Sequence, residues 1–222
     1  MAHRAEVDKM LRTIQTECSY TSGLTGIKKI SQPVMAAMAE VPRDEFVPDN
    51  MKPYAFDNRP LPIGNGQTIS QPFIVALMTD LLLPEADDVV LEVGGGCGYQ
   101  AVILAKLVKR VHTVEIVPAL AEQARDRLAS MGVRNAEVHL GDGSQGLPEY
   151  APFDGIIVTA AAARVPRSLL EQLKPGGRLV IPVGPPSSLQ FLMLYEKDRN
   201  GVIDSREVLG VAFVPLIGAH HD

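Results

Sequence analysis

Three acidic residues of the chain, Glu92, Glu115 and Asp142, stand at or just after the ends of segments that are predicted to be buried strands. The segments cover residues 89–93, 111–116 and 136–140, and they are apolar and rich in β-branched side chains. Because ligands of parallel sheets bind outside the carboxyl ends of the strands, we expect the three carboxylates to gather there. Such a group suits a cationic ligand better than an anionic one.

Alternating glycines, Gly94, Gly96 and Gly98, follow the first of these strands and precede a helix predicted over residues 100–108. Glycine permits a positive φ and lets backbone N–H groups approach a ligand at a helix N-terminus. A dinucleotide site would carry Gly or Ala where Tyr99 stands, and Glu92 would repel a pyrophosphate.

Glu115 follows Gly94 by 21 residues, the spacing at which an acid usually binds a ribose diol. These features favour an adenosine-type cation over a nicotinamide dinucleotide. S-adenosylmethionine, a sulfonium, is such a ligand. We expect its ribose at Glu115, its adenine near Asp142 and Gly143, and its methionine part above Glu92 and the glycine turn.

Hydroxyl residues mark a second region of interest, the segment 61–72. It ends an irregular stretch predicted over residues 49–69, and long irregular loops in compact domains tend to be functional. Ser70 is predicted to be the N-cap of a helix over residues 71–82. Alternatively, Thr68, Ser70 and free backbone N–H groups form a small anion site at that helix start. The sequence pattern favours neither interpretation over the other.

The surrounding pattern predicts a mostly parallel sheet with helical crossovers. A first amphipathic helix is expected to end before residues 19–23, and a second covers residues 32–40. The last apolar strands, 189–196 and 207–214, should close the sheet as an antiparallel hairpin. We expect a single domain over residues 1–222, with a helical and substrate-loop region at 1–70 and an α/β core at 71–222. Further elements of the core are predicted at 119–131 (helix), 154–159 (strand), 166–173 (helix) and 178–183 (strand).

Composition excludes several classes of protein. The 222 residues are 46% hydrophobic and 21% charged, with a net charge of −5 and no basic stripe for nucleic acid. No apolar run reaches the roughly 18 residues of a membrane span, and residues 1–10 contain no secretory signal, so a cytoplasmic location is expected. The two cysteines cannot form a disulfide framework, and Cys97 is interpreted as a packing residue.

No metal site is predicted. The pair His220 and His221 at the terminus is expected to be surface, and no other His or Cys cluster has the sequence spacing of a ligand set.

Ten short motifs lie between about residues 41 and 216. They are Val41-Pro42-Arg43, Phe46-Val47-Pro48, Leu61-Pro62-Ile63-Gly64, Gln67-Thr68-Ile69-Ser70-Gln71-Pro72, Leu91-Glu92-Val93-Gly94 continuing to Gln100, Gly141-Asp142-Gly143, Ala151-Pro152-Phe153-Asp154, Thr159-Ala160-Ala161, Gln172-Leu173-Lys174-Pro175-Gly176-Gly177 and Phe213-Val214-Pro215-Leu216. Together they resemble the motifs of the protein-L-isoaspartate (D-aspartate) O-methyltransferases. The glycine turn alone would indicate only a methyltransferase, whereas the segment 61–72 is specific to this family.

The resemblance implies a Rossmann-like class I methyltransferase fold with a seven-stranded sheet. It implies methyl transfer from S-adenosylmethionine to the free carboxylate of isoaspartyl residues in damaged proteins and peptides, which starts repair through a succinimide; D-aspartyl residues stay open as a second substrate. The expected protein is a monomer. The implied site residues are Ser70 (catalytic); Thr68, Ile69, Glu92, Gly94, Gly96, Gly98, Glu115, Asp142 and Gly143 (cofactor); and Ile63, Gly64, Ser70 and Val214 (substrate).

Other interpretations remain. A nucleic-acid base methyltransferase would carry an Asn- or Asp-Pro-Pro-aromatic motif where residues 159–162 read Thr-Ala-Ala-Ala. A methyltransferase of another small carboxylate, or a non-catalytic S-adenosylmethionine-binding module, would be separated from the favoured activity only by turnover.

Overall fold

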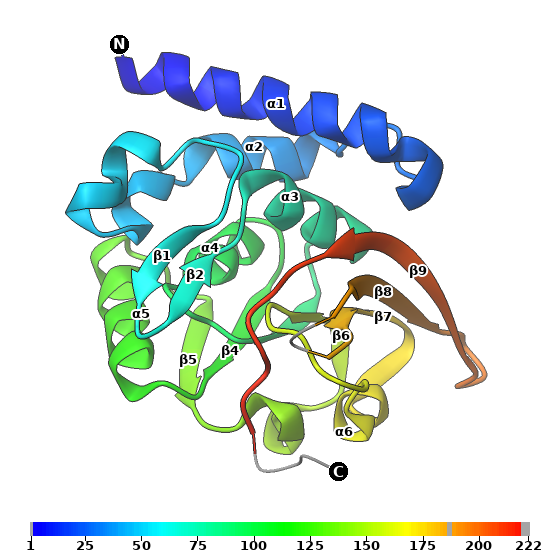
Figure 1. Ribbon diagram of the computed structural model, residues 1–222. Helices are drawn as coiled ribbons and strands as arrows, with labels where there is room; N and C mark the ends of the chain where they lie inside the picture. Colours follow the sequence, from blue (N-terminus) through cyan, green and yellow to red (C-terminus); the bar gives the residue numbers. More distant parts are fainter. Residues whose placement is uncertain (1, 186–187, 219–222) are drawn as a thin grey trace.

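The computed structural model describes residues 2–185 and 188–218. Its centre is a seven-stranded sheet in the order β5-β4-β3-β6-β7-β8-β9 (Figure 1). Neighbours from β5 to β7 pair in parallel, whereas β8 pairs antiparallel with both β7 and β9, so the predicted α/β fold with a C-terminal antiparallel hairpin is confirmed. The strands are β3 (Val89–Val93), β4 (Arg110–Glu115), β5 (Ala136–Leu140), β6 (Phe153–Val158), β7 (Leu173–Val183), β8 (Gln190–Lys197) and β9 (Ile203–Val211).

Helices cover both faces of this sheet. One core cluster joins α1 to α5 with one face, and a second joins α6 with the other. Successive residues of a strand point to opposite faces, which is why Val90 belongs to the first cluster and Leu91 to the second. The α-helices are α1 (Ala2–Thr25), α2 (Gln32–Glu40), α3 (Pro72–Leu81), α4 (Tyr99–Ala105), α5 (Pro118–Ser130) and α6 (Arg167–Glu171); the 3-10 helices are η1 (Arg43–Phe46), η2 (Asp49–Tyr54), η3 (Gly143–Gln145) and η4 (Pro148–Tyr150).

Helix α3 is the buried support of the pocket. All its residues are buried, because it contacts α1, α2 and β7. Apart from Thr79 and Asp80, which are hydrogen-bonded, its side chains are apolar, and each large apolar side chain so buried contributes about 1.5–3 kcal/mol. Figure 1 shows α1 lying across α2 and α3 at one end of the molecule.

The expected end of α1 before residues 19–23 is wrong, since the helix continues to Thr25. The polar side chains there bond back to the helix itself: Thr21 Oγ1 donates to the Glu17 carbonyl at 2.8 Å, and Ser22 Oγ to the Ser19 carbonyl at 2.8 Å. The helix ends at Gly26, whose φ is +75°.

The segment 49–69, expected to be irregular, contains η2 and a small antiparallel hairpin of β1 (Leu61–Gly64) and β2 (Gln67–Ile69). Its turn needs positive φ at three successive residues, Gly64, Asn65 and Gly66. Glycine and asparagine tolerate this conformation best. The chain runs from the end of this hairpin at Ile69 directly to the start of α3 at Pro72.

The chain leaves the sheet after Val211, earlier than the expected end at residue 214. The Gln190 side chain binds the Phe213 backbone on both sides, accepting from its N–H at 2.6 Å and donating to its carbonyl at 3.2 Å. Next, the Ala161 N–H donates to the Val214 carbonyl, and the Leu216 N–H to the Ala161 carbonyl, both at 2.8 Å. Residues 214–217 are thereby held beside the segment that follows β6. The predicted histidine pair, His220 and His221, lies outside the described residues.

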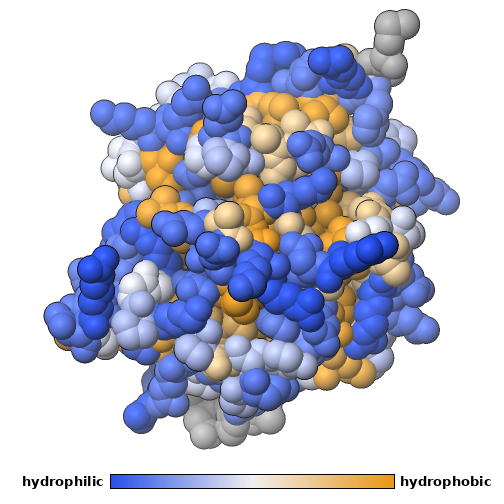
Figure 2. All heavy atoms as spheres, turned by 180° about the vertical axis from the view of Figure 1, so that it is seen from behind, coloured by the Kyte–Doolittle hydropathy of each residue, from blue (hydrophilic) through white to orange (hydrophobic). Residues whose placement is uncertain are grey.

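Across residues 2–185 and 188–218, no helix combines the length and the apolar character that crossing a membrane requires. Figure 2 shows the molecule from behind, where hydrophilic residues cover most of the face and hydrophobic ones show between them.

Candidate active site

A pocket lies where β3, β4 and β6 end, at the edge of the sheet that the strand pattern predicted. The β2–α3 segment and residues 214–217 form its other walls. Most of the predicted site residues line it: Thr68, Ile69, Ser70, Glu92, Gly94, Gly96, Glu115, Gly143 and Val214.

The glycine turn after β3 is held close to the neighbouring strands. The Val114 carbonyl accepts from the N–H groups of both Gly94 and Gly95, at 2.8 and 3.0 Å. Gly94 has a φ of +92°, and a Cβ there would lie 2.5 Å from Thr159 Oγ1. A side chain at this position would therefore distort the turn and narrow the pocket.

Glu115 has a structural role that the sequence did not reveal. Its Oε2 accepts from the Gly96 N–H at 2.7 Å, and its Oε1 accepts from the Val117 N–H at 2.8 Å. The buried carboxylate thus ties the glycine turn to the end of β4. Each oxygen keeps a lone pair, so the group can still accept bonds from ligand hydroxyls, as predicted for a ribose.

Glu92 is buried at the pocket, and neither carboxyl oxygen has a hydrogen-bond partner among the described residues. Burial raises the pKa of Glu92 to about 8; the neighbouring Thr113 hydroxyl opposes this rise, and the nearby Glu115 carboxylate adds to it. An unpaired buried carboxyl is costly unless a ligand group satisfies it. A cationic group would do so by favouring the ionised form of Glu92, and the residues therefore fit S-adenosylmethionine, whose methionine part was expected here.

Ser70 lines the pocket, but the prediction that it is an N-cap is wrong. The N-cap of α3 is Gln71, without a side-chain bond, because Pro72 takes the first helical position. The other interpretation, an anion site at the start of α3, is weakened because two backbone donors are missing. Pro72 has no N–H, and the Phe73 N–H donates to Asn58 Oδ1 at 3.0 Å. The Ser70 hydroxyl has no hydrogen-bond partner within residues 2–185 and 188–218 and is available to a ligand.

Arg43 was missed as a supporting residue. It is buried, its Nε donates to the Ala55 carbonyl at 2.8 Å, and its Nη2 donates to the Ser70 carbonyl at 2.6 Å. Its guanidinium lies 4.9 Å from the centre of the Tyr99 ring. The signal in the sequence was a cation within the Val-Pro-Arg motif, directly before a buried phenylalanine turn.

Four predicted residues do not line the pocket. Gly98 has a φ of +86° and lets α4 approach α5, since a Cβ would lie 3.0 Å from Leu128 Cδ1. Asp142 caps η3 by accepting from the Ser144 N–H at 2.9 Å. Ile63 is buried beside Gly96, and Gly64 forms the hairpin turn. Their ligand roles stay predictions.

Cys97 is buried with a free thiol, and burial raises its pKa, in agreement with its interpretation as a packing residue.

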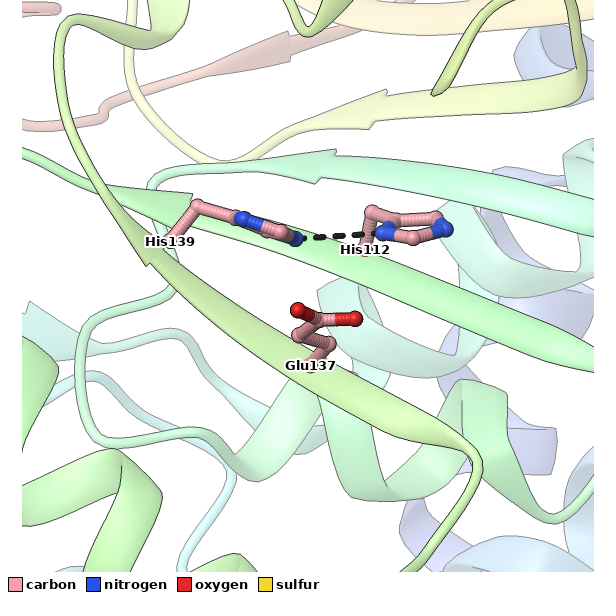
Figure 3. A group of neighbouring side chains, drawn as sticks. All are labelled: His112, Glu137 and His139. Atoms are coloured by element: carbon pink, nitrogen blue, oxygen red, sulfur yellow. Dashed lines mark hydrogen bonds between the residues drawn. The ribbon is translucent and has the colours of Figure 1, made fainter. Parts of the chain in front are cut away.

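A second group of polar side chains was not predicted from the sequence. His112, Glu137 and His139 lie close together on neighbouring strands, although His112 is distant from the other two in the sequence (Figure 3). Only the parallel register of β4 and β5 brings them together.

Comparison with known proteins gives a consistent result. The family described as Protein-L-isoaspartate(D-aspartate) O-methyltransferase (PCMT) matches residues 24–221. Protein-L-isoaspartate O-methyltransferase 2 of Syntrophobacter fumaroxidans is 56% identical over 212 residues, which cover 96% of this chain and 86% of the relative. The enzyme of the same name from Nitrosococcus oceani is 55% identical over 96% of both chains.

Solved structures agree with this fold. A protein-L-isoaspartate O-methyltransferase superimposes with a TM-score of 0.83 at 27% identity, covering 96% of this chain and 66% of that one. A structure from Plasmodium falciparum, in complex with S-adenosyl-L-homocysteine, has a TM-score of 0.77 at 23% identity over 97% of this chain and 98% of that one, and it shows the fold alone. With the family matched over most of its length, this chain belongs to the protein-L-isoaspartate (D-aspartate) O-methyltransferase family.

Proposed function

We propose that this methyltransferase binds S-adenosylmethionine in the pocket described above and methylates the free carboxylate of isoaspartyl residues in damaged proteins and peptides, which starts repair through a succinimide. The observation that carries the proposal is the composition of the pocket at the ends of β3, β4 and β6. It combines the unpaired buried carboxyl of Glu92, suited to a cation, with the free hydroxyl of Ser70, suited to a carboxylate.

S-adenosylmethionine supplies an electrophilic methyl carbon when it is bound. The acceptor carboxylate, with a pKa of about 4, is already ionised at pH 7, so the protein needs no general base. This agrees with a pocket whose described lining contains no histidine or lysine. The protein is left to align the reacting atoms and exclude water, and positioning of this kind supplies up to about 7–11 kcal/mol.

Ser70 is the proposed catalytic residue, with Thr68 supporting it. An ionised carboxylate that enters a dry pocket needs donors to replace its lost hydration. A neutral hydroxyl orients one oxygen and leaves the other free to attack, whereas a lysine would bind the ground state strongly and repel the sulfonium. Ile63, Gly64 and Val214 are proposed to receive the peptide.

Glu115 is proposed to bind the ribose hydroxyls, with Asp142 and Gly143 near the adenine. Glu115→Ala should raise the cofactor dissociation constant about tenfold to a hundredfold, by removing charge-assisted bonds of about 1.5–3 kcal/mol. Calorimetry measures this, and Glu122→Ala, an exposed acid on α5, is the control.

Because Glu115 also holds Gly96, a cofactor analogue without ribose hydroxyls separates the two roles. The mutation should weaken binding of the analogue less than binding of the natural cofactor. Equal weakening of both would remove the ribose assignment.

The activity itself is tested with a synthetic isoaspartyl peptide beside its normal aspartyl isomer. Methyl transfer should be strongly selective for the isoaspartyl peptide. Equal methylation of the two isomers, or transfer to neither, would reject the proposed substrate, and a small free carboxylate as the better acceptor would favour the alternative activity.

We also infer that the enzyme works as a cytoplasmic monomer on protein substrates, without binding nucleic acid or a membrane. Its net charge of −5 disfavours phosphate backbones, and Cys18 and Cys97 are both free thiols, as is usual in a reducing compartment. Light scattering during gel filtration should give the mass of one chain. A dimer mass at low micromolar concentration would contradict this.

A further inference from the structure

Three potential metal ligands lie on the sheet face opposite to Glu92 and Glu115. His112 on β4 is the direct partner of Glu137 on β5, and His139 follows two residues later, so all three side chains share one face. None of them lines the pocket. Figure 3 shows the two imidazoles joined by a hydrogen bond, with the carboxylate of Glu137, which shares β5 with His139, turned toward them.

The distances suit a single small cation. His112 Nδ1 and His139 Nε2 are 3.1 Å apart, and one ligand atom from each of the three residues lies within 4.8 Å of the others. Two nitrogens at this separation, each bound to zinc at about 2.05 Å, subtend about 98° at the metal, close to the angle of a tetrahedral site.

Aromatic rings shelter the two histidines. The Tyr150 ring lies 4.2 Å from that of His112 and 5.0 Å from that of His139, and Phe153 lies 6.2 Å from His112. Burial lowers the pKa of His112 to about 4 and also lowers the pKa of His139. One of the two facing nitrogens carries the proton of their hydrogen bond, and this proton must move to the other nitrogen of the same ring when a metal binds.

The geometry points to a binding site for a divalent transition-metal ion of the zinc class, held by His112, Glu137 and His139, with water in the fourth position. Two histidines and one glutamate are an established zinc ligand set, and three protein ligands leave one position open. The ion would join β4 to β5, the edge strand of the sheet. The bound ion is predicted to stabilise the pairing of β5 with β4.

Charged neighbours limit the affinity without preventing binding. Arg110 Nη2 contacts Glu137 Oε2 at 2.7 Å and competes with the ion for this carboxylate. The Arg110 side chain is 40% exposed, so it can turn into solvent and release the carboxylate. Arg125 also faces the group, and Glu149 offsets its charge. Arg110→Gln should therefore raise the metal affinity.

The test is calorimetric titration of the full chain with Zn²⁺, together with visible spectroscopy of Co²⁺ as a zinc substitute. A variant with His220→Gln and His221→Gln removes the only adjacent histidines of the chain and serves as the background. We expect one ion per chain in this background, a visible Co²⁺ spectrum of a four-coordinate site, and a higher thermal midpoint with metal.

Ligand variants decide the assignment. His139→Gln and Glu137→Gln should each weaken binding at least tenfold, while His3→Gln, an exposed histidine at the other end of the chain, should leave it unchanged. Thermal midpoints without metal show that the variants are folded, and Arg110→Gln provides a variant in which all three ligands remain. Three outcomes would overturn the proposed metal site. They are wild-type Zn²⁺ affinity in His139→Gln, loss of Zn²⁺ binding in the His220→Gln/His221→Gln background, and unchanged Zn²⁺ affinity in Arg110→Gln.

Discussion

At the scale of single residues, the Ser70 hydroxyl decides whether the pocket is catalytic as we propose. Ser70→Ala should reduce turnover by one to three powers of ten, about 1.4–4 kcal/mol, because the acceptor carboxylate loses a donor. Cofactor affinity and thermal midpoint should stay nearly unchanged, since the hydroxyl caps no helix and has no partner in the described chain. Single-turnover rates and calorimetry measure these quantities.

Ser31→Ala is the matched control for this prediction. Ser31 also stands before a helix, α2, and its side chain makes no capping bond there, but it lies outside the pocket. A normal single-turnover rate in Ser70→Ala, with the control behaving alike, would mean that the catalytic assignment is wrong.

Glu92 makes the stability of the ligand-free enzyme depend on pH. Folding raises its pKa from 4.5 to about 8, so the folded protein retains a proton that the unfolded chain releases between these values. Stability must therefore fall as the pH rises from about 4.5 to about 8. Glu92→Gln should remove this term, and its stability relative to the wild type should grow by up to about 1.4 kcal/mol per pH unit in that range.

Denaturant unfolding of both proteins at several pH values measures the Glu92 effect. Glu122→Gln, on the exposed face of α5, should follow the wild type at every pH. A constant difference between Glu92→Gln and the wild type would show that Glu92 ionises normally in the folded protein.

Residue types alone predicted most of the pocket but not the bonds between distant segments of the chain. Glu92, Glu115 and the glycines were found because strand ends and alternating glycines are local patterns. The bond from Gly96 to Glu115, the contact of Arg43 with Ser70, and the His112–His139 pair depend on distances between segments far apart in the chain. No periodicity of a single segment contains that information.

At the scale of elements, Arg43 connects η1 to the end of η2 and to the chain before α3. Arg43→Lys should lower the free energy of unfolding by about 1.5–3 kcal/mol, because lysine cannot reproduce two bonds from one planar fork. It should also reduce turnover per folded molecule, since the Ser70 backbone loses its donor, while cofactor affinity changes little. Rates are measured well below the thermal midpoint.

Arg59 offers the control for the Arg43 prediction. Its guanidinium also lies over a tyrosine ring, that of Tyr54 at 4.8 Å, but its side chain is 52% exposed. Arg59→Lys should therefore change neither stability nor rate. Normal turnover in folded Arg43→Lys would restrict Arg43 to a purely structural role.

The elements in the middle of the core were predicted well, whereas the short β1–β2 hairpin and the ends of the long elements α1, β7 and β9 were not. The strands and helices of the α/β core from residue 89 to 140 follow the apolar pattern, because burial on the sheet imposes it. The β1–β2 hairpin has strands of only four and three residues, too short for a period to show. The α1 end was misplaced because the hydroxyls of Thr21 and Ser22 bond to their own helix instead of stopping it.

At the scale of the whole molecule, one apolar cluster extends from Met10 in α1 to Val208 in β9. Arg206 also donates to the Thr25 carbonyl at 3.2 Å, which joins the end of α1 to the edge of the sheet. We therefore propose that the regions 1–70 and 71–222 unfold together as one domain. Calorimetry should show a single transition whose calorimetric and van't Hoff enthalpies agree.

Saturating cofactor should shift this single transition as a unit, because a ligand of the folded state stabilises everything that unfolds with its site. A separate early transition that does not respond to cofactor would show that the N-terminal region unfolds independently.

The pocket wall formed by residues 214–217 affects when the enzyme becomes active during its synthesis. Chains grow from the N-terminus, so on the ribosome the glycine turn and Glu115 emerge well before this wall. A chain stalled before residue 214 has emerged should hold a formed glycine turn beside an open pocket, and cofactor cross-linking to stalled and released chains would reveal the difference. We therefore predict that a newly made copy of the enzyme gains its activity only after residues 214–217 have left the ribosome and lie against the pocket.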